Sequence, residues 1–264
     1  MRLPVFAVLP LMIAPAVFAQ AGVPAGSSHY AIVEADNGKT VGSAEASVAT
    51  IPGGYQITSH GDLKMAKFTY SFSNDNRVDS QLNIVRDQLN GSVNGTSVAL
   101  DLASDSTGRQ FRISIVANGK TTTNTVDRHQ NLALMPDLDP AAYIAMTHFA
   151  LEHPATTWVV IPKQNGLLLP ALYNARPDLG AMFEGRPLTV HHTSVIVSEQ
   201  NGITVELYYA SDGRLLEADL PEQNFFVIHD GFRLQKRPQY TPPRGAAPPQ
   251  GAQPPGQGQP PQNQ

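Results

Sequence analysis

The chain of 264 residues contains no cysteine, only one tryptophan and few charged residues. The missing cysteines exclude disulfides, thiolate metal sites, a thiol nucleophile and the acylated cysteine of a lipoprotein anchor. Charged residues make up 15% of the chain and the net charge is −4, so no basic field is present to attract a polyanion. We therefore expect no nucleic acid partner, and we identify no metal site and no cofactor motif.

Long hydrophobic runs are scarce as well. Val5–Phe18 is apolar apart from Pro10 and Pro15, and it is too short to cross a bilayer. A positive start at Arg2 and small residues near Ala19 complete the pattern of a secretory signal peptide, which we predict over residues 1–21. No later run is long enough to span a membrane, so we expect no transmembrane segment and a mature protein that is periplasmic or secreted.

The C-terminal end is rich in proline, glutamine and glycine and has few apolar side chains. Pro-Pro pairs begin at positions 242, 248, 254 and 260. Such a composition cannot bury enough apolar surface to offset the entropy of ordering, so residues 238–264 are predicted to form a disordered tail. The folded domain is then expected over residues 27–237.

Within this domain the hydrophobic period is two, which is typical of half-buried antiparallel strands. Phe111, Ile113 and Ile115 alternate with polar residues, and Ile203–Tyr209 shows the same pattern. Asn-Gly and Asp-Gly pairs favour tight turns between strands because type I′ turns need positive φ. These pairs are Asn37-Gly38, Asn94-Gly95, Asn118-Gly119, Asn201-Gly202, Asp212-Gly213 and Asp230-Gly231. The predicted strands are 29–36, 40–50, 55–61, 64–73, 77–87, 96–103, 109–117, 120–127, 157–162, 187–199, 202–210, 214–219 and 225–229.

One stretch has helical character. Asp139 is suited to be an N-cap and Pro140 to be the first helical residue, so a helix is predicted near 139–152. Residues 162–187 contain four prolines and are predicted to be a long connecting loop that is either functional or a lid. Together these elements predict a mainly β fold, a long antiparallel meander curled into an open half-barrel (clam-like) with one main inserted helix.

Five segments carry a resemblance to a known group of proteins: Tyr30-Ala31-Ile32, Gly38–Ala44, the Asp139-Pro140 helix start, Val205–Tyr209 and Asp212–Leu216. Over roughly residues 28–236 the chain resembles periplasmic domain-of-unknown-function proteins whose fold is similar to that of lipoprotein-localisation carriers. The resemblance implies an open curved sheet with an apolar concave face, a shape that the carriers use to hold acyl chains. The chain departs from the anchored members because it has no lipid-bearing cysteine, and no carrier residue of known role matches a position here.

The alternating aromatic and aliphatic residues give the candidate ligand-binding face. If the sheet is open, one face of residues 68–72 and one face of residues 111–115 should line its concavity. Trp158 is interpreted as a core or rim aromatic, with stacking on a ligand as the alternative. The candidate ligand-binding residues are Phe68, Tyr70, Phe72, Phe111, Ile113 and Trp158. The expected partner is a lipid, an acylated ligand or an envelope protein.

Catalytic motifs are absent from the sequence. Asp105–Gly108 has one residue too many for an aspartic protease motif, and a hairpin turn explains it better. Glu217 and Asp219 share a strand face, where like charges should raise one pKa. We therefore expect a non-enzymatic binding or carrier protein. Two alternatives stay open: a hydrolase-like enzyme with a site assembled across strands from His192, Glu217 and nearby hydroxyls, and a structural envelope protein.

Overall fold

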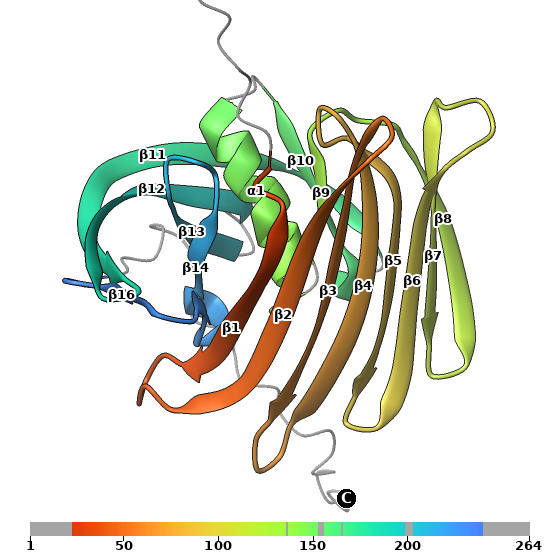
Figure 1. Ribbon diagram of the computed structural model, residues 1–264. Helices are drawn as coiled ribbons and strands as arrows, with labels where there is room; N and C mark the ends of the chain where they lie inside the picture. The colour runs from red at the N-terminus through yellow and green to blue at the C-terminus, as the bar shows by residue number, and fades with distance from the viewer. Residues whose placement is uncertain (1–22, 136, 153–155, 165, 199–202, 240–264) are drawn as a thin grey trace, which may run out of the picture.

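The computed structural model describes residues 23–135, 137–152, 156–164, 166–198 and 203–239. The predicted signal peptide, nearly all of the predicted tail and the Asn201-Gly202 turn lie outside these residues. The described chain forms one 16-stranded sheet with a single α-helix (Figure 1). The described chain is mainly β and its sheet is open, which confirms the predicted fold class.

The first eight strands form a continuous antiparallel meander in which each strand pairs with the next. The alternation of buried and exposed residues along them explains why they form strands with one face covered. We call these strands the meander half. They are β1 (Gly26–Glu34), β2 (Thr40–Ile51), β3 (Gly54–Lys64), β4 (Thr69–Asp79), β5 (Ile84–Val93), β6 (Thr96–Ser104), β7 (Gln110–Ala117) and β8 (Lys120–Asp127).

The remaining elements follow the meander. They are β9 (Leu132–Leu134), α1 (Pro140–Glu152), β10 (Thr157–Ile161), the 3₁₀ turn η1 (Pro162–Gln164), β11 (Leu167–Phe183), β12 (Arg186–Ser198), β13 (Ile203–Tyr209), β14 (Leu215–Leu220), the 3₁₀ turn η2 (Pro221–Gln223), β15 (Phe225–His229) and β16 (Phe232–Leu234). The sheet order is β8-β7-β6-β5-β4-β3-β2-β1-β15-β14-β13-β12-β11-β10-β9, so β15 joins the C-terminal strands to the edge of the meander at β1.

The C-terminal strands bend back on themselves, and we call β11 to β16 the curled half. The first residues of β11 pair with β10, and its last residues, Ala181–Phe183, pair with β16. Because β16 follows β15 through a short turn, the strands from β11 to β16 curl around their own small core. Figure 1 shows the long β11 and β12 sweeping around this half, with α1 lying between it and the meander.

The expectation of a loop over 162–187 was wrong. Residues Leu167–Phe183 form β11, a strand of 17 residues. Pro177 fits because of where it lies: the pairing with β12 shifts between Arg176 and Leu179, which places Pro177 in an irregularity of the ladder. Proline lacks an N–H group and is tolerated at such a bulge, where a regular ladder bond is not required.

The predicted breaks in two other strands were also misplaced. The expected strand over 77–87 crosses a real turn, in which Leu82 has φ of 59° and the Asp79 carboxylate accepts hydrogen bonds from the backbone N–H groups of Gln81 and Asn83 at 2.9 Å. The turn between β3 and β4 lies at Met65–Phe68 instead of near residue 62. Neither turn contains an Asn-Gly or Asp-Gly pair.

The tight turns predicted at Asn94-Gly95 and Asn118-Gly119 are confirmed. Asn94 and Asn118 have φ of 50° and 52°, and the glycines that follow them have φ of 81° and 69°. Positive φ at both central positions is the mark of a type I′ turn, which matches the twist of the flanking strands. These turns set the register of β5 with β6 and of β7 with β8.

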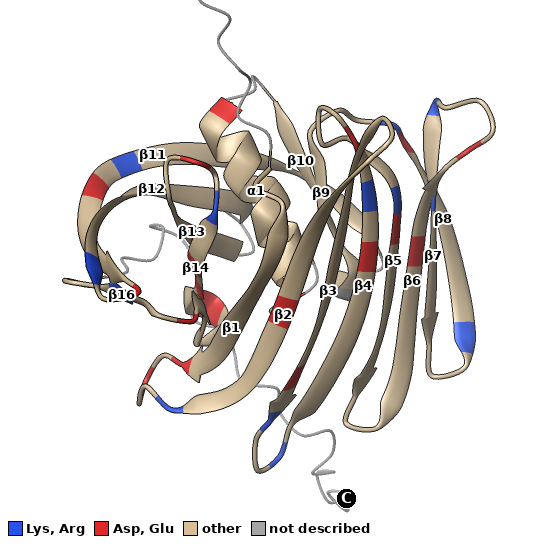
Figure 2. Cartoon of the chain, viewed as in Figure 1, with Lys and Arg blue, Asp and Glu red and all other residues tan. Residues whose placement is uncertain are grey.

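The main core lies between the concave face of the sheet and α1. Asp139 caps the helix, and the residues from Pro140 to Ala150 are all buried. The helix packs against β2 and β3 of the meander and against β13 and β14 of the curled half, so one helix serves both. Figure 2 shows charged residues scattered singly over strands and turns rather than gathered into a field of one sign.

Candidate ligand-binding site

An apolar cavity of about 420 Å³ lies on the concave face of the meander half. Its sheet wall comes from β4 to β7, and its other wall comes from the segment before α1, from η1 and from the start of β15. The lining is apolar except at Tyr70, Asp137 and Gln223. The full set is Phe68, Tyr70, Leu89, Val93, Val98, Ala99, Leu100, Ile115, Ala117, Met135, Asp137, Leu138, Pro162, Gln223 and Phe225.

Tyr70 lines this cavity and packs against Phe72, which lies behind it. Tyr70 lies beside Phe72 with the ring centroids 5.6 Å apart and the planes at 27°. Burial raises the pKa of the Tyr70 hydroxyl, and the carboxylates of Asp139 and Asp137 raise it further. The hydroxyl is therefore neutral at physiological pH, and a neutral hydroxyl can donate a hydrogen bond.

A hydrogen bond joins two segments of the cavity wall that faces the sheet, η2 and the segment before α1. The Gln223 side chain in η2 donates a hydrogen bond from Nε2 to Oδ1 of Asp137 at 2.7 Å. These residues are 86 positions apart in the sequence, and both line the cavity. The bridge holds the C-terminal strands against the segment before α1, so the cavity wall combines segments from the middle and the C-terminal part of the domain.

The structure brings only some of the predicted ligand-binding residues to this cavity. Phe68 and Tyr70 line it. Phe72 lies next to them but is only 4% exposed, and its ring covers Gly61, where an added Cβ would be 2.8 Å from the ring. On β7 the cavity is lined by Ile115 and Ala117, beyond the predicted pair on that strand.

The other three predicted residues lie away from the cavity. Phe111 and Ile113 are fully buried in the main core. The backbone at Gly166 covers Ile113, since a Cβ there would lie 3.1 Å from Ile113 Cγ2. Trp158 is half-buried on β10 and packs on the ring of His129 with the centroids 4.2 Å apart.

Sequence reasoning missed the residues that come from outside the meander. Met135, Leu138, Gln223 and Phe225 complete the cavity from segments distant in sequence. The only usable signal was the alternation in β6, which places Val98 and Leu100 on the same face as the aromatic residues of β4. Nothing local indicates that η2 and β15 fold over this face.

A buried polar cluster lies beside the start of α1. Asp139 accepts hydrogen bonds from Ser59 Oγ at 2.5 Å, from Asn74 Nδ2 at 2.7 Å and from the backbone N–H of Ala141 at 2.9 Å. Asp87 is fully buried on the neighbouring strand β5, beside Asn74. Burial, and then the charge of Asp139, raises the pKa of Asp87 well above its ordinary value. The cluster therefore favours a neutral, protonated Asp87.

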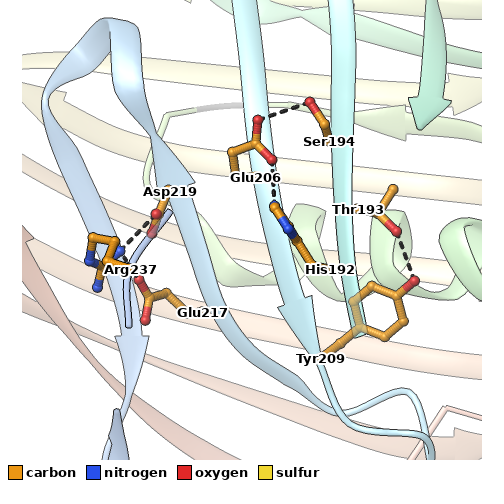
Figure 3. Close-up of polar contacts among 8 residues, drawn as sticks. All are labelled: His192, Thr193, Ser194, Glu206, Tyr209, Glu217, Asp219 and Arg237. Atoms are coloured by element: carbon orange, nitrogen blue, oxygen red, sulfur yellow. Dashed lines mark hydrogen bonds and ion pairs between the residues drawn. The ribbon is translucent and has the colours of Figure 1, made fainter. Parts of the chain in front are cut away.

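A second group of polar side chains lies on β12 and β13, on the sheet face opposite the helix (Figure 3). His192 Nε2 lies 2.7 Å from Glu206 Oε2, and Ser194 Oγ donates to Oε1 of the same carboxylate at 2.9 Å. The serine hydroxyl is thus directed to the glutamate rather than to the histidine, and Ser194 is only 2% exposed. A nucleophilic serine needs the base within hydrogen-bond reach, so these three groups do not form a triad.

Glu217 and Asp219 lie on one face of β14, as predicted, and both bind Arg237. Asp219 Oδ2 is 2.7 Å from the Arg237 guanidinium, and Glu217 Oε1 contacts the same nitrogen (Figure 3). Burial raises the pKa of Asp219 well above its usual range, and the charge of Glu217 raises it further. The proposed partners of a hydrolase-like site, His192 and Glu217, are each engaged with a different residue, Glu206 and Arg237.

Metal clusters and membrane-spanning helices are both absent from the described part of the chain. In these residues no three His, Cys, Asp or Glu side chains converge in a way that would hold a metal ion. Neither is any described helix long and apolar enough to cross a membrane.

No family model matches this chain, and no curated protein matches it in sequence. Among solved structures it is similar to a DUF1089 family protein from Pseudomonas aeruginosa, at 13% sequence identity and a TM-score of 0.42, with 84% of this chain and 97% of that chain covered. At this level the likeness carries no argument about ligand or activity; it is a likeness to a β-rich protein of a domain-of-unknown-function family.

Proposed function

We propose that this domain is a non-enzymatic binding or carrier protein that holds an acyl chain or another apolar ligand in the cavity beside Phe68 and Tyr70. The observation that carries the proposal is the cavity itself, about 420 Å³ lined by apolar side chains except at three positions. Small-molecule sites in proteins have volumes of roughly 300 to 1,000 Å³ and combine apolar walls with a few polar groups.

The position of the helix supports this proposal. A carrier needs part of the concave face to stay uncovered, because a face filled by the helix has no room for a ligand. Ile144 and Phe149 of α1 are buried in the main core, and neither lines the cavity. The helix therefore covers one region of the sheet and leaves the surface of β4 to β7 near Tyr70 open to a ligand.

The polar groups at the cavity give the ligand an orientation. Tyr70 offers a neutral hydroxyl, and the Asp137–Gln223 pair presents carboxylate and amide groups. An amphipathic ligand would place its chain against Leu89, Val98 and Ile115 and its polar group toward this pair. The resemblance to lipoprotein-localisation carriers over residues 28–236 belongs to the same proposal.

Binding of a fluorescent fatty acid tests this function. Ala117→Trp, on the cavity face of β7, should fill the cavity and weaken binding at least tenfold. Val116→Trp is the matched control, because Val116 is on the opposite face of the same strand and is 37% exposed. Glutamate at Phe111 or Ile113 is a poorer probe, since both side chains are fully buried and a charge there would destabilise the fold. Lack of saturable binding by the unaltered domain would contradict the proposal and favour a structural or protein-binding role.

Export is a second part of the proposal. We infer from residues 1–21, which lie outside the described residues, that the protein is periplasmic or secreted. The mature N terminus should be Gln20 or Gly22, and N-terminal sequencing of protein recovered from outside the cytoplasm measures it. Intact Met1 on exported material would contradict this assignment.

A further inference from the structure

The apolar cavity on the meander half has a closed end. Leu100 and Ile115, a cross-strand pair of β6 and β7, line the cavity. The next pair along these strands, Leu102 and Ile113, is fully buried in the main core and does not line it. Leu89, which lies opposite Leu100 on β5, is also buried. A ligand that reaches this row of side chains therefore cannot extend further along the strands.

The opposite end of the cavity is more accessible, and we call it the mouth. Val98 and Ala117, the next pair in this direction, are half-buried, and the Asn118-Gly119 turn follows directly. Val93 on β5 is half-buried as well, and the Asn94-Gly95 turn comes next. Because only the mouth is accessible to water, an amphipathic ligand would place its terminal methyl group at the closed end and keep its polar group at the mouth.

The distance between the two ends sets the length of chain that fits. Leu89 and Val93 mark the closed end and the mouth on β5, and they are four positions apart. A strand rises about 3.3 Å per residue, so about 13 Å of sheet separates them. An extended hydrocarbon chain advances about 1.3 Å per bond, because its C–C bonds of about 1.5 Å meet at about 111°. The floor of the cavity therefore matches about ten bonds of such a chain.

The volume of the cavity gives a similar size. A methylene group is about as large as a water molecule, whose share of liquid volume is about 30 Å³. The cavity of about 420 Å³ therefore holds about 14 non-hydrogen atoms. A single chain of about 12 carbon atoms with a small polar group has this many atoms, so the volume and the length of the floor agree.

We propose that the cavity binds a single unbranched chain of about 10 to 12 carbon atoms, with its methyl end against Leu89 and Leu100. This inference rests on the binding function proposed above, and it adds the class of ligand, a medium-chain amphiphile. A longer chain meets the row of Leu102 and Ile113 beyond the closed end, so its additional methylenes stay outside the mouth in water. They contribute no further burial, and the affinity does not rise with them.

A chain-length series tests the inference. The unaltered protein is titrated calorimetrically with straight-chain fatty acids of about 6 to 18 carbon atoms, each below the concentration at which it forms micelles. Affinity should rise about fourfold per methylene up to about 10 to 12 carbon atoms, which corresponds to about 0.8 kcal/mol for each buried methylene. For longer acids the affinity should level off, because the added methylenes remain in water.

Two variants locate the closed end. Leu89→Ala frees space there, so the chain length at which affinity levels off should increase by about two carbon atoms. Leu63→Ala is the matched control, because Leu63 is buried in the same core but does not line the cavity. In this control the affinity should level off at the same chain length as in the unaltered protein.

Affinity that keeps rising to about 18 carbon atoms would overturn the inference and leave the proposed binding function in place. So would a folded Leu89→Ala variant whose affinity levels off at the unaltered chain length, or an equal shift in Leu63→Ala. If Leu89→Ala does not fold, the length series on the unaltered protein decides. No binding at any chain length would overturn this inference together with the proposed function.

Discussion

The meander half of the sheet covers its concave face with a separate helix, whereas the curled half covers its own inner face by bending until β16 pairs with β11. The first arrangement leaves an apolar cavity where the helix does not reach. The second leaves a pocket lined by charged groups, because β13 and β14 carry Glu206 and Asp219 on that face. One sheet thus presents two chemically different recesses, and the difference follows from what covers each face.

The helix is common to both halves, and this makes their stabilities interdependent. Phe149 is 1% exposed and lies in the main core. Phe149→Ala should lower the free energy of unfolding by about 3 to 5 kcal/mol, because it removes a buried ring and leaves a cavity. Urea denaturation measures this loss. Leu151→Ala, at the half-buried end of the helix, should lower the free energy of unfolding clearly less. Equal losses from Phe149→Ala and Leu151→Ala would contradict the placement of Phe149 in the main core.

The closure of the curled half can be tested at Phe232, which is 7% exposed on β16. Phe232→Ala should lower the free energy of unfolding by about 3 kcal/mol, which is the lower end of the range for a buried phenylalanine. Because α1 contacts strands of both halves, we expect one cooperative transition by circular dichroism and by tryptophan fluorescence. Two separate transitions in the variant would mean that the halves are independent folding units.

The buried carboxyl group of Asp87 should make the meander half sensitive to pH. Its folded-state pKa is raised, so the stability that it contributes is fully present below the unfolded value near 3.9 and is lost as the pH rises through the folded value. Asp87→Asn, which cannot ionise, should therefore be the more stable form at neutral pH, by at least about 1.4 kcal/mol, the free energy that corresponds to a tenfold change in proton affinity. Its unfolding free energy should also vary less between about pH 4 and pH 7.

The control for this prediction is Asp62→Asn, because Asp62 is exposed on β3 and should leave the pH dependence unchanged. A lower stability of Asp87→Asn at neutral pH would mean that the carboxylate is charged and has a stabilising partner.

The smallest effect is expected at the hairpin between β7 and β8. Gly119 has φ of 69°, and a Cβ added there would contact nothing within 4 Å. Gly119→Val should cost about 1 to 2 kcal/mol, and the whole cost should be conformational, since a β-branched residue resists positive φ. Thermal unfolding measures it. A neutral substitution would show that this turn can change type without loss of register.

Local signals explain most of what could be predicted about the fold. Asn118-Gly119 and Asp139-Pro140 act through their own backbone preferences, so the turn and the helix start appear in the sequence without knowledge of the rest. β11 was missed because its prolines are read locally as breakers. Whether Pro177 is tolerated depends on the bulge opposite β12, and that is a property of the partner strand.

The candidate site divides in the same way. Alternation predicts that Phe68 and Tyr70 share one face, and both side chains line the cavity. The same alternation grouped Phe111 and Ile113 with them, although the backbone near Gly166 covers that part of the face. Periodicity predicts which face a side chain is on, but it carries no information about what packs against that face.

The sequence by itself determined most of the strands, the Asn-Gly turns, the capped helix and the sheet face to which each alternating residue belongs, since these depend on neighbours a few positions apart. Only the tertiary structure decided where the helix lies, which apolar residues remain beside a cavity and which charges meet. Gln223 reaches Asp137, and Arg237 reaches Glu217 and Asp219, only because β15 joins β1 and β16 joins β11. Such pairings result from long-range strand register and the shared burial of distant segments, which no local pattern encodes.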